Sequence, residues 1–187
     1  MRIVILKFGA IGDMVFASPL VRALRPHASQ LGIVTLPWSR QVFEHHPLVD
    51  RLHLYDPWSV RGPAKLRLAA QIMADLRREK YDAAVILHRS PFAPLLALGG
   101  GIPRRVGFRQ RLARLLLTSA VDFDPEQHEV RRNVSLLAGL GLPVPEEPRT
   151  EMHPEPEVRI DPFLQKGTVP LVGLFPGGGV NPGMEFA

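Results

Sequence analysis

The first 26 residues constrain the fold more than any other stretch of the chain. Residues 2–7 are a short, almost unbroken apolar run rich in β-branched side chains, which is typical of a strand buried on both faces of a parallel sheet. A turn that carries Gly9 and Gly12 follows at once, and apolar side chains then recur at helical spacing over residues 14–24. Strand, glycine turn and helix together predict the opening of an α/β fold, a Rossmann-like doubly wound parallel sheet.

Asp13 lies where the chemistry of such a sheet is expected. Ligands bind at the carboxyl ends of the strands, and Asp13 stands just past the first strand, on the first turn of the helix. It is either a general base or a residue that only stabilises the helix start. Pro19 interrupts this helix, so we expect either a kink near Ser18 or a single turn at 13–17 followed by a main helix with Ser18 as its N-cap.

The glycine turn differs from the familiar phosphate-binding loops. It lacks the glycine spacing of Gly-x-Gly-x-x-Gly, no acidic residue closes the second predicted strand, and no Gly-Lys-Ser/Thr follows. These differences argue against a nicotinamide or nucleoside-triphosphate site at this end of the chain.

Length and composition limit the class of protein. With 187 residues, of which 45% are hydrophobic and 22% charged, the chain suits one globular α/β domain and is too short for two large ones. No apolar run approaches the ~18 residues of a membrane span, so we expect a cytoplasmic location. The absence of cysteine excludes disulfides and thiolate metal sites.

The net charge of +5 comes mainly from clustered arginines, at 104, 105, 109, 111, 114, 131 and 132. Clusters of this kind indicate an anionic partner, which could be nucleic acid, a phosphorylated glycolipid or an acidic membrane surface. Nucleic acid is the least favoured of the three, because no aromatic-studded strand or recognition-helix pattern accompanies the arginines.

Further elements continue the α/β pattern. Strands are predicted at residues 31–36, 51–55, 82–88, 104–108 and 120–124, with helices at 64–80, 92–98 and 129–140 and a short helix or turn at 38–45. The strand at 51–55 alternates and is expected near an edge of the sheet. The strand at 82–88 would bring His88, Arg89 and Ser90 to the same carboxyl edge as Asp13.

Two groups of metal-binding residue types favour other interpretations. His45 and His46 lack the i, i+4 spacing of a helical zinc pair and are interpreted as surface histidines. Asp122 and Asp124 share one side of a strand but precede Pro125, which favours a solvated turn. No metal site is therefore predicted.

The chain changes character after residue 141. Residues 142–168 are rich in proline and glutamate and are interpreted as a linker, whereas 169–175 form another buried-type strand that leads into Gly177, Gly178 and Gly179. We expect a first domain at 1–141, a linker at 142–168 and the start of a second domain at 169–187. A lone strand cannot satisfy its backbone groups, so we expect the chain to be a fragment.

Several motifs resemble those of the ADP-heptose:lipopolysaccharide heptosyltransferases, glycosyltransferase family nine. They occur in that family's order at residues 7–15, 18–24, 101–108, 128–133, 136–142 and 172–179. The resemblance implies a two-domain GT-B transferase that inverts the anomeric centre and uses neither a metal nor another cofactor. The first domain would bind the acceptor and the second the nucleotide sugar.

The resemblance also implies roles for particular residues. Asp13 would be the catalytic base, and the donor site would begin at Gly177, Gly178 and Gly179. Acceptor contacts are expected from Gly9, Gly12, His88, Arg104, Arg105 and His128. The implied partners are an ADP-heptose-like donor and an anionic glycolipid or glycan acceptor, with a peripheral contact at the inner membrane surface and no nucleic acid.

The fragment itself is expected to be inactive, because the lysine that the family places after the glycine loop lies beyond residue 187. A second interpretation stays open at this point. The chain could be a stand-alone binding module for a phosphorylated or acidic ligand.

Overall fold

The computed structural model describes residues 1–110 and 115–153, which are built around one parallel sheet. The sheet has 6 strands in the order β3-β2-β1-β4-β5-β6, and each neighbouring pair is parallel. The strands are β1 (Arg2–Leu6), β2 (Gln30–Thr35), β3 (Arg51–Leu54), β4 (Ala83–Ile86), β5 (Arg104–Phe108) and β6 (Ser119–Val121). The predicted α/β, Rossmann-like doubly wound parallel sheet is confirmed, with β3 at an edge.

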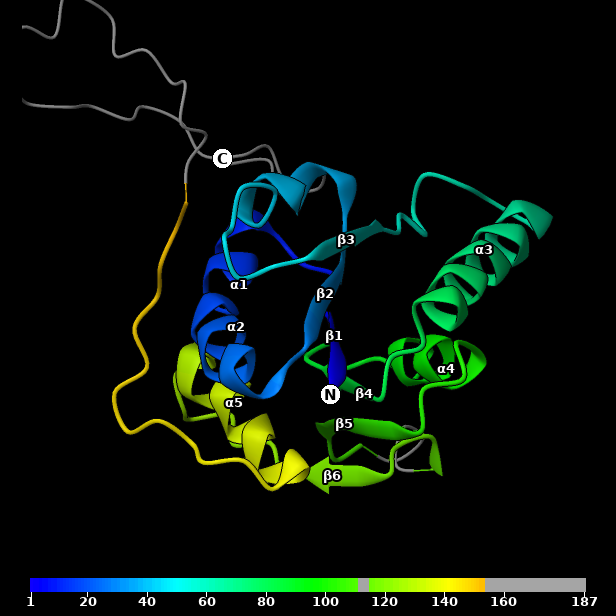
Figure 1. Ribbon diagram of the computed structural model, residues 1–187. Helices are drawn as coiled ribbons and strands as arrows, with labels where there is room; N and C mark the ends of the chain where they lie inside the picture. Colours follow the sequence, from blue (N-terminus) through cyan, green and yellow to red (C-terminus); the bar gives the residue numbers. More distant parts are fainter. Residues whose placement is uncertain (111–114, 154–187) are drawn as a thin grey trace, which may run out of the picture. The chain divides into compact units, whose positions relative to one another are not determined.

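Helices cover both faces of the sheet. In Figure 1, α1, α2 and α5 lie on one face, and α3 and α4 lie on the other. The α-helices are α1 (Ile11–Val15), α2 (Ser18–Leu24), α3 (Pro63–Glu79), α4 (Phe92–Gly99) and α5 (Glu129–Ser135). Shorter 3₁₀ helices are η1 (Arg25–His27), η2 (Pro37–Val42) and η4 (Leu136–Leu140).

Strand β1 shows why the sheet needs two helical layers. Ile3 and Ile5 pack into the apolar cluster that contains residues of α1 and α2, whereas Val4 and Leu6 pack into the cluster that contains residues of α3 and α4. All four side chains are buried. A strand covered on both faces is apolar throughout instead of alternating, and this explains the unbroken run at the start of the sequence.

Two separate helices, α1 and α2, follow the glycine turn. This is the second of the two geometries considered for Pro19, a short first turn followed by a main helix. α1 ends at Val15 and α2 begins at Ser18, so Pro19 lies in a first helical turn, where its missing N–H costs little. Ser18 is not the N-cap, however. Ala17 holds that position, and the Ser18 hydroxyl donates to the Val15 carbonyl at 2.7 Å.

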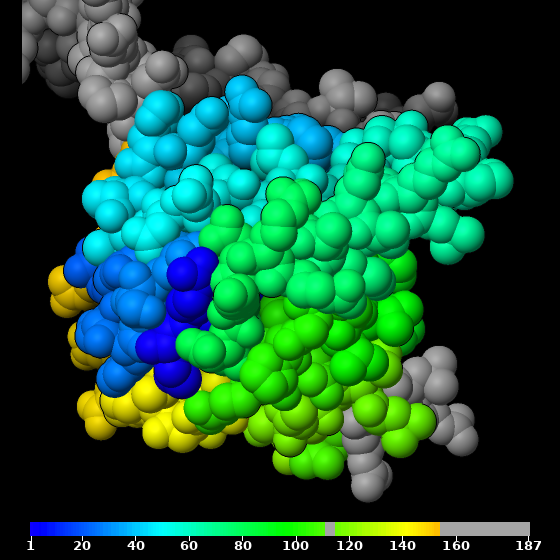
Figure 2. Space-filling model, turned by 45° about the vertical axis from the view of Figure 1, so that its right-hand side comes forward, coloured from blue at the N-terminus to red at the C-terminus, as the bar shows by residue number. Residues whose placement is uncertain are grey.

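Helix α3 packs on the core only from Leu68 onward. Ala69, Ile72 and Leu76 are buried, but Leu66, which lies at helical spacing from them, is 75% exposed. The sequence is amphipathic over the whole helix, yet the core ends before the first turns of the helix are reached. Figure 2 shows these turns standing out at one corner of the visible face.

The last 3₁₀ helix ends in a left-handed turn. Helix η4 closes at Gly141, whose φ of +71° suits glycine, and residues 142–153 then run without a helix or strand. The described residues belong to one compact unit, Met1–Glu155. The predicted strand at 169–175 and the loop of Gly177, Gly178 and Gly179 lie outside the described residues, and the predicted domain boundaries stay a prediction.

Candidate active site

The carboxyl ends of β1 and β4 meet at a cavity of about 340 Å³. The two strands are paired side by side, Leu6 opposite Ile86, so the residues that follow them are brought together. The polar residues that line the cavity include Lys7, Asp13, His88, Arg89, Glu129 and Arg132. Asp13 and His88 therefore share one site at the carboxyl edge of the sheet.

Asp13 folds back against the glycine turn. Its Oδ2 accepts a hydrogen bond from the backbone N–H of Ala10 at 3.1 Å. A Cβ atom at Gly9 would lie 2.6 Å from the same oxygen, so this position requires glycine. Among the described residues, the donor to this carboxylate binds Oδ2. Oδ1 is therefore available to a ligand.

Gly12 meets a different requirement from Gly9. It is exposed, and no atom of the described residues lies within 4 Å of the place where its Cβ would be. The packing within the domain therefore does not explain a glycine here. An open backbone beside Asp13 is compatible with the predicted close approach of a substrate.

Lys7 and Glu129 form a largely buried ion pair at the carboxyl end of β1. The Lys7 Nζ donates to the Glu129 Oε1 at 2.6 Å, and the two side chains are only 10% and 24% exposed. Lys7 directly follows β1, whereas Glu129 is the first residue of α5. The pair therefore fixes α5 against the strand end that leads to Asp13.

His88 is held in its neutral form. Its ring packs edge-on against Phe8, with 5.5 Å between the centroids. Burial is the main reason that the pKa of His88 lies below its ordinary value, and the positive charge of Lys7 lowers it further while Asp13 opposes the shift. A neutral imidazole can donate one hydrogen bond and accept another near Asp13.

Two arginines form a cationic wall of the cavity. The guanidinium groups of Arg89 and Arg132 lie 4.0 and 4.8 Å from the centroid of the same ring, that of Phe123. Arg132 also donates to the carbonyl oxygens of Asp124 and Pro125. The wall therefore presents positive charge to the space beside Asp13, which favours an anionic ligand.

Arg104 and Arg105 do not reach this site, contrary to the expectation from the sequence. They open β5, and Arg104 is paired with Ala83 at the start of β4, so both lie at the amino edge of the sheet. Arg104 donates to the Leu140 carbonyl, and Arg105 donates to three backbone carbonyl oxygens, among them that of Leu116. These bonds give both arginines a structural role.

His128 is also separate from the Asp13 cavity. It is the N-cap of α5, where its Nδ1 accepts a hydrogen bond from the N–H of Val130 at 3.3 Å. Its ring packs edge-on against Phe16, and both residues line a second cavity, of about 560 Å³. Three other residues of this motif, Glu129, Arg132 and Asn133, do line the Asp13 cavity.

Of the charged residues of the site, the sequence predicted Arg89 at the carboxyl edge and Arg132 within an anion-binding cluster, but Lys7 and Glu129 were missed. Lys7 ends a predicted strand, and this position alone could have marked it. Glu129 and Arg132 lie three positions apart on one helix face, but nothing in the sequence shows that α5 packs beside β1.

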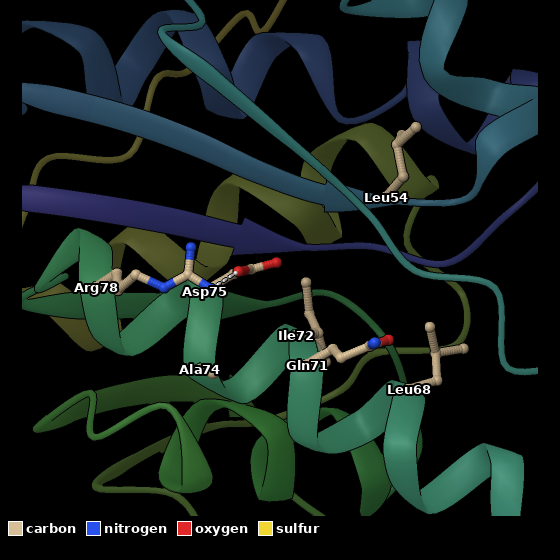
Figure 3. A pocket seen from close by; sticks show the side chains of 7 residues that line it. All are labelled: Leu54, Leu68, Gln71, Ile72, Ala74, Asp75 and Arg78. Atoms are coloured by element: carbon tan, nitrogen blue, oxygen red, sulfur yellow. Dashed lines mark ion pairs between the residues drawn. The ribbon is translucent and has the colours of Figure 1, made fainter.

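Another cavity, of about 390 Å³, lies on the far side of the sheet. It runs along α3 beside Leu54, and the ion pair between Asp75 and Arg78, at 2.7 Å, stands at its rim (Figure 3). No residue predicted to bind substrate lines it. The Asp13 cavity is therefore the better candidate for an active site.

Comparison with solved structures relates this fold to known glycosyltransferases. The chain superposes on E. coli ADP-heptose lps heptosyltransferase II with a TM-score of 0.66 and 23% identity, over 82% of this chain and 47% of that one. The glycosyl transferase family 9 protein from Veillonella parvula gives a TM-score of 0.69 and 22% identity, over 82% and 44%. E. coli heptosyltransferase WaaC with ADP gives 0.66 and 21%, over 79% and 50%.

The chain has the fold of these transferases. It spans about half the length of the solved structures that it matches. The sequence matches no protein-family model and no curated protein. The heptosyltransferase fold implied by the sequence motifs is thus confirmed for the aligned part of the chain.

Proposed function

We propose that this chain belongs to an inverting glycosyltransferase of family nine with a two-domain GT-B architecture. It would move a heptose or a related sugar from an ADP-sugar to an inner-core lipopolysaccharide or similar glycan acceptor. One observation carries the proposal: in a fold shared with heptosyltransferases, Asp13 lies at the carboxyl edge of the sheet and keeps one carboxylate oxygen free beside a cavity.

The geometry supports Asp13 as the general base. The acceptor hydroxyl oxygen attacks the anomeric carbon, and its proton passes to Oδ1 of Asp13. The bond between the anomeric carbon and the phosphate oxygen breaks on the opposite face, and ADP leaves with the electron pair. The hydrogen bond from Ala10 holds Oδ2, so the carboxylate keeps one orientation during the transfer.

The charges around the cavity support an anionic acceptor. Arg89 and Arg132 face the same space as Asp13, whereas the charge of Lys7 is paired with that of Glu129. Arginine suits carboxylates and phosphates because its N–H groups form a planar fork. Acidic sugars or phosphate groups of the acceptor would bind along this wall. Neutral His88 would position the attacking hydroxyl by a hydrogen bond.

The donor would bind in a second domain that begins at residue 169, at a site that begins with Gly177, Gly178 and Gly179, outside the described residues. Backbone N–H groups of such a glycine turn suit the diphosphate of an ADP-sugar. E. coli WaaC, whose fold this chain shares, has been solved with ADP. Neither a metal nor another cofactor is part of this proposal.

An exposed aromatic pair supports a peripheral contact with the inner membrane from the cytoplasmic side. Trp38 and Trp58 are 52% and 58% exposed, and their ring centroids are 6.4 Å apart. Exposed Leu66 and the exposed cations Lys65 and Arg67 follow on the protruding start of α3. Tryptophan beside basic residues suits the interface of an anionic bilayer. No helix in the described part of the chain is long and apolar enough to cross a membrane.

The direct test of the proposed function is a transfer assay with the full-length protein. ADP-heptose and an inner-core acceptor should give ADP and a glycan whose new linkage is inverted relative to the donor. Saturable binding of a phosphorylated glycan without any transfer, in a full-length protein that is folded, would favour the alternative of a binding module.

A further inference from the structure

Glu151 fastens the end of the described chain to α2. Its backbone N–H donates to the Ser18 hydroxyl at 2.9 Å, and its Oε2 pairs with the guanidinium of Arg22. The other carboxylate oxygen, Oε1, faces two imidazoles. It lies 3.4 Å from Nε2 of His46 and 3.9 Å from Nε2 of His153.

These three facing atoms are buried and have no hydrogen-bond partner among the described residues. The side chain of His46 is 0% exposed, so the interpretation of His46 as a surface histidine is wrong. His46 follows η2 and packs against Phe43, which turns its ring inward, whereas His45 is exposed. Buried polar atoms are normally hydrogen-bonded, so three that converge on one point without a partner among the described residues indicate a missing ligand.

We propose that His46, Glu151 and His153 form a structural zinc site that holds residues 142–153 on the first domain. Two imidazoles and one carboxylate are a donor set that Zn²⁺ prefers, with water as the fourth ligand. The ligand atoms of a tetrahedral zinc ion lie roughly 3.3–3.5 Å apart, given bonds of about 2.0–2.2 Å. The three atoms found here lie within 4.8 Å of one another, so small side-chain movements complete the site.

The surroundings of Glu151 suit a metal ligand. Arg22 and Ser18 hold its carboxylate and its backbone, and such outer contacts orient a coordinating carboxylate.

Zinc binding has one identifiable cost. The N–H of Leu48 donates to Nδ1 of His46 at 3.2 Å, so the ring proton of the metal-free side chain lies on Nε2. Zinc would replace that proton, which moves to Nδ1 and breaks the bond to Leu48. One neutral hydrogen bond is a small loss compared with the binding of a structural zinc ion.

The proposed site is separate from the candidate active site. None of its ligands lines the Asp13 cavity, so zinc takes no part in the proposed transfer reaction. Its expected effect is to keep residues 142–153 ordered. This inference stands on its own contacts and does not depend on the proposed function.

Titration of the metal-free chain with Zn²⁺, against a competing chelator, tests the site. We expect one Zn²⁺ per chain, with affinity reduced roughly 100-fold or more in His46→Ala and in His153→Ala. The variant His45→Ala removes the exposed neighbouring imidazole and should bind zinc as the unchanged protein does. Co²⁺ should give the visible absorption of a tetrahedral site in the unchanged protein but not in His153→Ala.

A second measurement distinguishes loss of the zinc ligand from loss of folding. His46 is buried, but His153 lies on the outer segment, and circular dichroism can show that His153→Ala remains folded. Zinc should slow tryptic cleavage at Arg149 in the unchanged chain and in His45→Ala, but not in His153→Ala. The proposal is overturned if the unchanged chain binds no zinc, as expected of a site that holds only water, or if folded His153→Ala binds it equally well.

Discussion

Gly9 and Gly12 share one turn but meet different requirements. Gly9 lies against the carboxylate of Asp13, where a methyl group has no room, whereas Gly12 faces open space. The sequence shows two glycines in a turn and cannot distinguish these reasons. The structure separates them, because one contact belongs to the fold and the other is left for a ligand.

Alanine at each glycine should therefore have a different effect. Gly9→Ala should displace Asp13 and lower the free energy of unfolding by about 1–3 kcal/mol, with a loss of turnover in the full-length enzyme. Gly12→Ala should leave stability unchanged or slightly higher, because alanine favours the helix. Urea denaturation measures both effects. Equal stability of the two variants would contradict the assigned packing.

At the scale of elements, the order of strands and turns was predictable. The buried runs, glycine turns and the edge position of β3 follow from patterns within short windows of sequence. The meeting of Asp13 and His88 follows from one rule, that parallel strands end at the same edge. This rule needs only the strand assignments.

Features that depend on packing between distant elements were not predictable. Arg104 and Arg105 were predicted to bind the acceptor partly because arginines cluster there. They begin a strand, however, and thus lie at the amino edge of the sheet. Leu66 fits the helical pattern but extends past the core, and His46 is buried by contacts with a segment far along the chain. A local pattern gives the face of an element and does not show which neighbour covers it.

Arginines at the two edges of the sheet should respond differently to substitution. Arg89→Gln removes a cation of the cavity wall and should raise the KM for an anionic acceptor about 10-fold, with a small change in stability. Arg105→Gln should instead cost about 1–3 kcal/mol of stability, because carbonyl oxygens lose their donor. Steady-state kinetics and urea denaturation separate the two effects. An acceptor KM raised only by Arg105→Gln would contradict this assignment.

At the scale of the whole molecule, buried histidines make stability depend on pH. The pKa of His46 is lowered to about 4 in the folded state, and the pKa values of His53 and His88 are lowered as well, in each case mainly by burial. The unfolded chain therefore binds more protons than the folded chain below about pH 6.5. The contribution of these histidines to the free energy of unfolding is fully present above that pH and is lost as the pH falls towards 4.

We expect His46 alone to account for up to about 3 kcal/mol of this loss, measured with a chelator present. His46→Gln should flatten the decrease in the free energy of unfolding between about pH 6.5 and 4. Urea denaturation at several pH values measures it. His45→Ala is the control, because His45 is exposed and close in sequence. The same pH dependence in His46→Gln as in the unchanged chain would contradict the account.

The exposed tryptophans should support binding to anionic membranes. The full-length protein should sediment with vesicles that contain an anionic phospholipid, and a smaller fraction should sediment with zwitterionic vesicles. Trp38→Ala with Trp58→Ala should weaken retention about 10-fold or more. Met152→Ala, which removes another exposed apolar side chain, should not. Equal retention of the double variant and the unchanged protein would exclude this surface as the membrane contact.

The central claim is that Asp13 acts as a base and not only as a helix-start residue. Asp13→Asn keeps the shape of the side chain and an oxygen for the Ala10 N–H, but it removes basicity. Asp122→Asn is a matched control, because that carboxylate is exposed and lies outside the cavity.

The deciding measurement is kcat of full-length Asp13→Asn, under conditions where the chemical step limits turnover. We expect a loss of about 100-fold or more, with donor and acceptor binding retained and stability changed by at most about 1 kcal/mol. Asp122→Asn should turn over at the rate of the unchanged enzyme. Sugar transfer by Asp13→Asn at close to that same rate would contradict the claim and leave Asp13 a purely structural role.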